Sequence, residues 1–315
     1  MTTLSKLQPL HHPLFTKHEV LIQVKRDDNI HPTISGNKWR KLKYNLEHVL
    51  QSNNINGVLS FGGSYSNHIH ALAFACFQRN IPCIGLIRGE QHYASNCTLT
   101  WAKHWGMKLH FVDRKTYRRR HDTDYLTELQ RQYPNYFIVP EGGSNTLAIK
   151  GVAEIITELN KQTEYDTLIT PVGSGGTLAG LITGDLNSNA NLHKLLGVAV
   201  LKEAEYLKNT IQQLLPEPVK KHNNWQLLTN FHRGGYAKFT PLDANRILEF
   251  NRITGVDFEP VYSGKMVLAF LDLLEQGYFA KGERIILLHT GGMQGIGGMI
   301  ERGILKAEYW STFKK

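Results

Sequence analysis

The chain has 315 residues, of which 41% are hydrophobic and 20% are charged. This composition is typical of a globular protein with a sizeable core, and it argues against long disordered segments. Lysine and arginine (36) exceed aspartate and glutamate (27), and the resulting net charge of +9 is compatible with nucleic acid, anionic substrates or a phosphorylated cofactor.

The cysteines and the apolar runs bear on the cellular compartment. The three cysteines form neither a CxxC motif nor a metal-ligand spacing, so they fit a reducing compartment better than a disulfide framework, and we expect no metal site. No run approaches the roughly 18 apolar residues of a membrane span, and the N-terminus lacks a continuous apolar stretch. We expect a soluble, cytoplasmic protein that does not contact a membrane.

Short apolar runs rich in β-branched residues alternate with longer segments of helical periodicity. The predicted strands are, in chain order, 20–24, 57–61, 82–87, 108–112, 136–139, 167–172, 195–200 and 284–288. The predicted helices between them include 38–50, 67–79, 146–159 and 265–274. This alternation predicts an α/β protein with parallel sheets flanked by helices.

The first candidate for chemistry is the segment around Lys38, where Arg40, Lys41 and Lys43 follow within five residues. A cluster of this kind is usually a solvated basic face. It is also compatible with a lysine that forms a Schiff base, because basic neighbours disfavour its charged form and leave more of it nucleophilic. The residues alone do not decide between the two.

The second candidate follows the predicted strand 57–61, where two glycines precede Ser66, Asn67 and His68 at a predicted helix start. Free N–H groups at such a start can bind a carboxylate, although Ser66 and Asn67 could equally be helix caps. His68 and His70 are two residues apart and point in different directions on a helix, which argues against a zinc pair.

The third candidate is a glycine-rich turn that follows the predicted strand 167–172. It consists of Gly173, Ser174, Gly175, Gly176 and Thr177. Glycines let a ligand approach the backbone, and the N–H groups at the start of the next helix favour a phosphate. The alternative is a plain strand-to-helix turn, since the segment matches neither a Walker A loop nor GxGxxG.

Taken together and in order, these segments resemble pyridoxal-phosphate enzymes of fold type II. More narrowly, the chain resembles the 1-aminocyclopropane-1-carboxylate (ACC) deaminase and D-cysteine desulfhydrase family from about residue 20 to 295. The matching segments are Gly36–Leu42 with the preceding Lys25–Asp28, Gly62-Gly63 with Ser66-Asn67, Pro140–Asn145, the turn at 173–177, Pro260–Lys265 and His289–Gly292.

The resemblance implies a two-domain enzyme. A large cofactor-binding domain would comprise residues 1–47 and 154–315, and a small α/β domain, 48–153, would be inserted into it. The resemblance also implies pyridoxal 5'-phosphate as cofactor, a small amino acid as substrate, and a homodimer.

The resemblance further implies roles for individual residues. Lys38 would carry the cofactor and move the α-proton, with Lys41 as an electrostatic helper. Asn67 would hydrogen-bond the cofactor's phenolic oxygen, the 173–177 turn would hold its phosphate, and Thr290 would also contact it. The substrate pocket would be formed by Ser66, which receives the substrate carboxylate, and by Asn67, His68, Tyr236, Tyr262 and Ser263, with Ser66 and both tyrosines counted among the catalytic residues.

Two positions favour D-cysteine desulfhydrase over ACC deaminase. The ACC deaminase pattern has Glu after the pocket tyrosine and Leu before the late Gly-Gly pair, whereas this chain has Ser263 and Thr290. A neutral hydroxyl near the cofactor's pyridine nitrogen would deepen the electron sink less than a carboxylate. Loss of a thiolate requires less carbanion stabilisation than opening a cyclopropane ring. We therefore expect β-elimination that converts D-cysteine to pyruvate, sulfide and ammonia.

Three alternatives stay open. ACC deaminase, which yields 2-oxobutyrate and ammonia, is the nearest. Departures from the family at Trp39, Ser64-Tyr65 and His68 are compatible with a cofactor-binding protein that acts on another D- or β-substituted amino acid, and a cofactor-binding protein without turnover also stays open. A nucleic-acid-binding module would use the basic run 114–120, which we interpret instead as a solvated segment, so no nucleic-acid partner is expected.

Overall fold

The computed structural model describes residues 4–34, 36–188, 193–217 and 223–310. The chain divides into two compact units. The first contains Met1–His31, Ser35–Asn37 and Ile149–Met293, and the second contains Pro32–Ile34, Lys38–Ala148 and Gln294–Lys315. A unit defined by its contacts need not be a domain that folds alone, so the domain boundaries at 47/48 and 153/154 stay a prediction.

The first unit is built on a six-stranded sheet with the order β1-β2-β10-β7-β8-β9. Its strands are β1 (Leu7–Leu10), β2 (Leu21–Lys25), β7 (Thr167–Val172), β8 (Lys194–Ala199), β9 (Trp225–Leu228) and β10 (Arg284–Leu288). Only β1 is antiparallel to its neighbour, so the other five strands place their carboxyl ends at one edge of the sheet.

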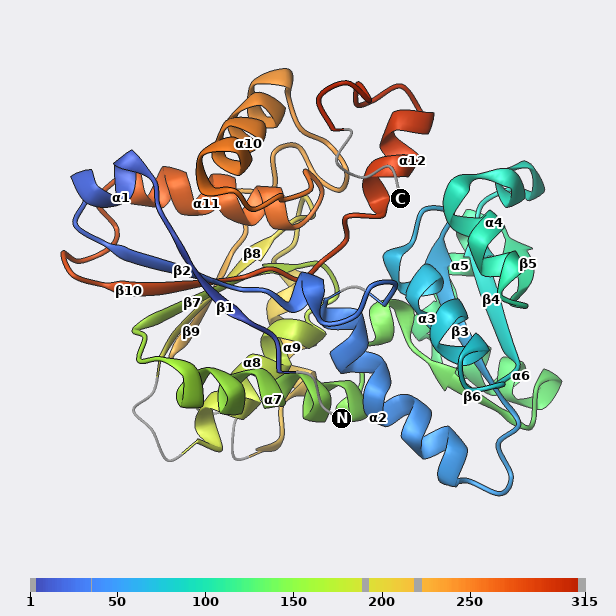
Figure 1. Cartoon of the computed structure of the whole chain (residues 1–315). Coiled ribbons are helices and arrows are strands. Elements are labelled where there is room, and N and C mark those ends of the chain that lie inside the picture. Colours follow the sequence, from blue (N-terminus) through green and yellow to red (C-terminus); the bar gives the residue numbers. More distant parts are fainter. Residues whose placement is uncertain (1–3, 35, 189–192, 218–222, 311–315) are drawn as a thin grey trace. The chain divides into compact units, whose positions relative to one another are not determined.

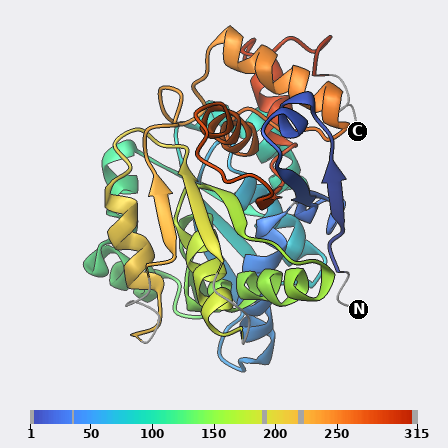
Figure 2. The ribbon, with the colours of Figure 1, turned by 90° about the vertical axis from the view of Figure 1, so that its left-hand side faces the viewer.

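Helices cover both faces of this sheet, as parallel strands require. They are α1 (Pro13–Lys17), α7 (Thr146–Gln162, from Ile149 onward), α8 (Gly176–Leu186), α9 (Tyr206–Leu214), α10 (Pro241–Thr254) and α11 (Ser263–Glu275). Helices α8 and α11 both contact β7 and β8, and Figures 1 and 2 show them on opposite faces of the sheet. A buried aliphatic core lies between α7, α8, α9 and the central strands.

The second unit is built on a four-stranded, fully parallel sheet with the order β5-β4-β3-β6. Its strands are β3 (Gly57–Gly63), β4 (Cys83–Arg88), β5 (Lys108–Val112) and β6 (Tyr136–Val139). Its helices are α2 (Asn37–Gln51, from Lys38 onward), α3 (Asn67–Phe77), α4 (Cys97–His104), α5 (Arg114–Arg118), α6 (Thr123–Gln132) and α12 (Gly295–Glu301), together with the short 3₁₀ helices η2 (Gln91–Ser95), η3 (Arg119–His121) and η4 (Glu141–Gly143).

Alternate residues of β3 and β4 face two separate apolar cores in this unit. Val58 and Cys83 pack with α2, α3 and α4, whereas Leu59 and Ile84 pack with Tyr117 and residues of α6. This period of two explains why the strands are apolar throughout, since both faces of the sheet are buried.

The predicted fold class, an α/β protein with parallel sheets flanked by helices, is confirmed. All eight predicted strands are present, with ends that differ by at most two residues. The sequence analysis missed β1 and β9, which are four-residue strands at the two edges of the larger sheet, where one side of each strand has no strand to pack against. No helix in the described part of the chain has both the length and the apolar character to span a membrane.

His70 of α3 makes the stability of this fold depend on pH. The ring is buried and packs edge-on against Trp105 with the centroids 4.9 Å apart, and burial lowers its pKa to about 4. The unfolded chain therefore binds a proton at this site between about pH 6.5 and 4, whereas the folded chain does not, and stability falls as the pH falls through that window.

Replacing His70 with phenylalanine removes this titration. Between pH 7.5 and pH 5, we expect the wild type to lose about 2 kcal/mol more of its unfolding free energy than His70→Phe. Urea unfolding at the two pH values measures the difference. Equal losses in the two proteins would contradict the argument.

Candidate active site

Lys38 is the second residue of α2, and its side chain turns toward the end of strand β6 within the second unit. Its Nζ lies 3.4 Å from the carbonyl oxygen of Gly142. Lys41, one helical turn later, donates to the same oxygen over 3.3 Å and to Ser144 Oγ over 3.0 Å. The amines of two predicted site lysines thus both lie within hydrogen-bond distance of one backbone carbonyl oxygen.

The carbonyl that receives both lysines belongs to a turn that only glycine adopts readily. Gly142 and Gly143 have φ values of 69° and 73°, in the left-handed region. A Cβ on Gly143 would lie 3.2 Å from the His68 ring and 3.6 Å from Lys41 Cβ. The Gly-Gly pair therefore lets the backbone pass between a lysine and a histidine.

Burial weakens the basicity of both amines. It lowers the pKa of Lys38 to about 8, while the nearby Glu141 carboxylate acts in the opposite direction. Burial also lowers the pKa of Lys41 well below its usual range, and the charge of Lys38 adds to that shift. At pH 7 roughly a tenth of Lys38 is therefore uncharged and nucleophilic, far more than for an ordinary lysine, and this is the form that a Schiff-base lysine requires.

Ser66 and Asn67 begin helix α3. Ser66 is its N-cap, and its Oγ accepts a hydrogen bond from the N–H of Ile69 over 3.3 Å. Ser66 therefore caps the helix, which was one of the two roles considered from the sequence. The cap uses the N–H of Ile69 and leaves other N–H groups of the first turn open to a ligand. The Asn67 amide has no hydrogen-bond partner within the described residues, and Gly295 leaves space beside it, since a Cβ there would lie 3.4 Å from Asn67 Oδ1.

His68 is buried and presents an unpaired acceptor. Its Nε2 lies 2.8 Å from Ser60 Oγ, and that hydroxyl donates to the Val139 carbonyl over 2.7 Å. Because the only proton of Ser60 Oγ is used there, Nε2 carries the imidazole proton and Nδ1 is an acceptor. Burial and the two lysines lower the pKa of His68 well below its usual range, so the ring is neutral. Nδ1 has no partner among the described residues.

In the first unit, the glycine turn 173–177 joins β7 to α8. Gly175 adopts a φ of 81°, and α8 has no side-chain cap, so the first N–H groups of the helix are not taken by a capping side chain. Thr177 Oγ1 accepts from the Asn37 amide over 2.9 Å, and the Asn37 N–H donates to the Thr290 carbonyl over 3.2 Å. Asn37, the residue before Lys38, is therefore hydrogen-bonded both to the glycine turn and to Thr290.

Tyr236 and Tyr262 lie together in the first unit, with ring centroids 5.8 Å apart in an edge-on arrangement. A Cβ on Gly173 would lie 3.0 Å from the Tyr262 ring, so this tyrosine also lies against the glycine turn. The loop that carries Tyr236 is held by the buried Lys265, whose Nζ donates to the carbonyls of His232, Val200 and Gly235. Tyr236 itself is 45% exposed.

Ser263 is buried and hydrogen-bonded to a carboxylate that the sequence analysis did not single out. Glu259 accepts from the N–H groups of Val261, Tyr262 and Ser263 over 2.7–2.8 Å, and the Ser263 hydroxyl lies 3.2 Å from Glu259 Oε1. Burial raises the pKa of Glu259 to about 7, although these hydrogen bonds favour its charged form. Glu259 therefore fixes the backbone that positions Tyr262 and Ser263.

Within each unit the predicted residues gather. Lys38, Lys41 and His68 surround the turn at 142–143, and Ser66 and Asn67 begin the helix that carries His68. In the first unit, the turn at 173–177 lies beside Tyr262, and Thr290 is a buried residue just after β10 that binds Asn37 through its carbonyl. Among the described residues, no three His, Cys, Asp or Glu side chains are grouped so as to hold a metal ion.

Comparison with known proteins decides the family. Residues 2–291 match the family described as pyridoxal-phosphate dependent enzyme. The chain belongs to that family. The family and the cofactor predicted from the sequence are thereby confirmed, as is the prediction that the protein is an enzyme.

Individual relatives narrow the resemblance. A Pyrococcus abyssi protein that carries the provisional name 1-aminocyclopropane-1-carboxylate deaminase is 30% identical over 287 residues, covering 87% of this chain and 85% of that protein. The mitochondrial bifunctional D-cysteine desulfhydrase/1-aminocyclopropane-1-carboxylate deaminase of Arabidopsis thaliana is 27% identical over 308 residues, covering 91% of this chain and 76% of that protein. A crystal structure of an ACC deaminase homologue has a TM-score of 0.79 and 25% identity, covering 96% of this chain and 94% of that one.

The chemistry of the residues present fits pyridoxal phosphate. A buried lysine of lowered pKa suits covalent attachment to an aldehyde, and an uncapped helix start after a glycine turn suits a phosphate. The Nδ1 of buried His68, which has no partner among the described residues, is a polar atom that a bound ligand would satisfy.

Sequence reasoning missed three residues that support this site. Ser60 fixes the His68 tautomer, Asn37 links the glycine turn to Thr290, and Glu259 supports Tyr262. Asn37 lies inside the matching segment Gly36–Leu42, although no role was predicted for it, and Glu259 directly precedes the segment Pro260–Lys265. Ser60 lies inside an apolar strand, where only tertiary packing reveals its role.

The lowered pKa of Lys38 predicts how the cofactor-free protein captures added pyridoxal phosphate. Only the uncharged amine reacts, so the rate should rise with pH and reach half its limit near pH 8. The matched control is Nα-acetyl-lysine, whose ordinary amine has a pKa of about 10.4. Its rate of reaction should still be rising with pH at pH 8. Stopped-flow absorbance measures both rates. A protein profile that follows the control would contradict the effect of burial.

Proposed function

We propose that this enzyme deaminates a small amino acid by β-elimination and that D-cysteine is its substrate, giving pyruvate, sulfide and ammonia. The observation that carries the proposal is the buried Lys38 of lowered pKa in a chain of this family. The choice of D-cysteine is supported by the neutral residues Ser263 and Thr290 and by relatives named for this activity.

The cofactor would be held by residues from several of the matching segments, which begin at Lys38 and end at Thr290. Lys38 Nζ would form the covalent link, and the Asn67 amide would donate to the phenolic oxygen. The N–H groups of the 173–177 turn and of the α8 start would bind the phosphate, because a helix start favours an anion. Lys41, whose charged form burial disfavours, would add positive charge once a phosphate anion is bound nearby, and Thr290 would lie near the ring.

The substrate would be received by groups that are polar and pre-positioned. Ser66 and the N–H groups that begin α3 would bind its carboxylate. Tyr236 and Tyr262 would line the side-chain pocket, with Ser263 behind Tyr262. The neutral His68, whose acceptor Nδ1 is unpaired, would accept a hydrogen bond from a donor on the substrate.

Lys38 would perform the proton transfer. When bound, pyridoxal phosphate supplies an electron sink that stabilises negative charge at the substrate's α-carbon. The Lys38 amine, with a pKa of about 8, would accept the substrate's α-proton near neutral pH. Departure of the β-thiolate and hydrolysis then give pyruvate and ammonia.

Ser263 supports elimination over ring opening. A carboxylate at this position would keep the pyridine nitrogen protonated, whereas the Ser263 hydroxyl is neutral and already bonded to Glu259. ACC deaminase stays the second candidate, because relatives with that name match this chain over most of its length.

The proposal is tested first on the role of Lys38. The purified protein with pyridoxal phosphate should have an absorbance band near about 410–420 nm, and Lys38→Ala should lose it. Lys43→Ala, on the same helix, is the matched control and should keep the band. A band that survives in Lys38→Ala would overturn the assignment of this lysine.

The same preparations then separate the two substrates. We expect D-cysteine to yield pyruvate and sulfide with a kcat/KM at least about tenfold above that for conversion of ACC to 2-oxobutyrate. L-cysteine is the stereochemical control, and Lys38→Ala should turn over none of the three. A preference for ACC would replace the first candidate with the second. An intact band without turnover of any of them would point to a different amino acid.

We also propose that the enzyme is a cytoplasmic homodimer with an inserted domain at residues 48–153, as the family resemblance implies. Sedimentation velocity at micromolar concentration should give about twice the monomer mass of 35.8 kDa. A single species at the monomer mass would contradict the dimer. Cell fractionation with a tagged chain tests the compartment.

A further inference from the structure

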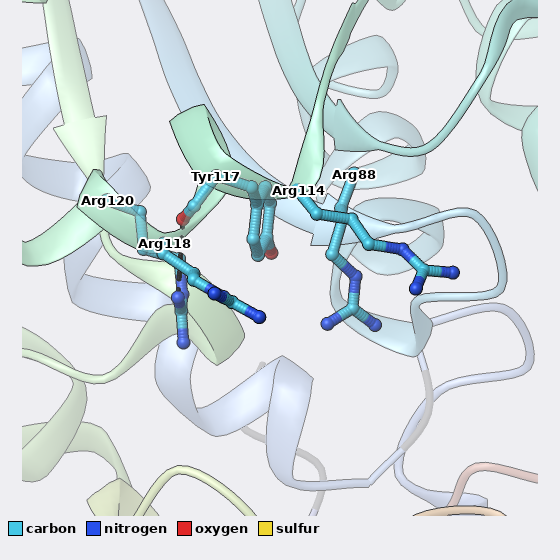
Figure 3. A pocket seen from close by; sticks show the side chains of 5 residues that line it. All are labelled: Arg88, Arg114, Tyr117, Arg118 and Arg120. Atoms are coloured by element: carbon cyan, nitrogen blue, oxygen red, sulfur yellow. Dashed lines mark hydrogen bonds between the residues drawn. The ribbon is translucent and has the colours of Figure 1, made fainter.

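A hollow lined by arginines lies within the second unit, apart from every residue assigned to the reaction above. Its volume is about 390 Å³, within the range of small-molecule sites. It is lined by Arg88, Arg114, Tyr117, Arg118 and Arg120, which Figure 3 shows around one space.

The parallel sheet explains why these arginines meet. Arg88 is the last residue of β4 and pairs in register with Val112, the last residue of β5. Helix α5 starts two residues after β5, with Asp113 as its N-cap. Arg88 at the end of β4 and the arginines that follow β5 therefore lie at the carboxyl edge of the sheet, which is where α/β proteins bind ligands.

Tyr117 forms a rigid wall between the arginines. Its ring is 2% exposed, and the guanidinium carbons of Arg88 and Arg120 lie 5.5 and 5.0 Å from the ring centroid. Figure 3 shows the ring between Arg118 and Arg120 on one side and Arg88 and Arg114 on the other. The positions of Arg88 and Arg120 are thus fixed by a buried aromatic.

The charge around the hollow is not balanced by the protein. Arg120 pairs with Glu141, with 2.5 Å between Nε and Oε2. The carboxylate of Asp113 is used by the N–H groups of Lys115 and Thr116 and by the Thr116 hydroxyl. Within the described residues, Arg88, Arg114 and Arg118 have no ion pair. Three guanidinium groups, which stay charged at any physiological pH, therefore line one hollow without an ion-paired carboxylate among the described residues.

We propose that this hollow binds a small polyanion with two or more adjoining phosphate groups, such as the di- or triphosphate part of a metabolite. Guanidinium groups bind phosphate oxygens in pairs, and three uncompensated arginines match an anion of about three charges. A nucleic acid fits less well, because the one aromatic of the hollow is buried between arginines and offers no face on which a base could stack.

The test uses the enzyme loaded with pyridoxal phosphate, so that the proposed phosphate turn is already filled. Isothermal titration calorimetry at about 0.15 M salt measures binding of inorganic tripolyphosphate, pyrophosphate and phosphate. We expect tripolyphosphate to bind once per chain and at least about tenfold more tightly than phosphate. Arg88→Gln and Arg118→Gln should each weaken its binding about tenfold, and Arg118→Lys should weaken it less.

Arg131→Gln is the matched control, because it removes the same charge from an exposed position on α6 outside the hollow. It should change binding by less than about twofold, and thermal unfolding should be alike in all variants. An equal loss in Arg131→Gln would mean that only the net charge of the protein acts, and it would overturn the proposal. So would the absence of binding, or tighter binding of a single-stranded RNA 12-mer that the same substitutions weaken.

Discussion

The proposed chemistry of this enzyme depends on the burial of two lysine amines beside one backbone carbonyl. Lys38 and Lys41 lie one turn apart on α2, and both donate to Gly142, whose left-handed conformation orients the carbonyl toward them. A buried ammonium group is costly, so each amine gives up part of its basicity, and the presence of one charge disfavours the other. An amine that is partly uncharged near neutral pH could attack a carbonyl carbon and later accept a proton, and its placement favours both proposed steps.

Glu141 opposes the effect of burial on the pKa of Lys38, and it also binds Arg120. Its carboxylate accepts from Tyr117 Oη and from Arg120, each over 2.5 Å, while its charge favours the protonated form of Lys38. The next residue is Gly142, which receives both lysines. A single short segment after β6 therefore affects the electrostatics of Lys38 on one side and pairs with Arg120 of the arginine-lined hollow on the other.

The first unit uses buried charges in a different way, to hold loops that carry uncharged site residues. Glu259 is surrounded by the backbone N–H groups of 261–263, and Lys265 by the carbonyls of three separate loop residues. In both cases the loop backbone provides the partners, so the loops that carry Tyr262 and Tyr236 are held by the side chains of Glu259 and Lys265. Rigid support of loop residues after parallel strands is a general arrangement for ligand binding.

The sequence by itself determined the fold class, the family and the cofactor, and it predicted the segments of the site. Apolar strand periodicity, glycine turns after strands and the order of motifs around Lys38 are all local properties. Only the tertiary structure decided which partners surround each residue. The His68 tautomer depends on Ser60, eight residues away on a strand, the pKa of Lys38 depends on burial, and the arginine-lined hollow depends on β4 and β5 ending at one edge. Burial and charge pairing arise between residues that are distant in the chain, so no local pattern contains them.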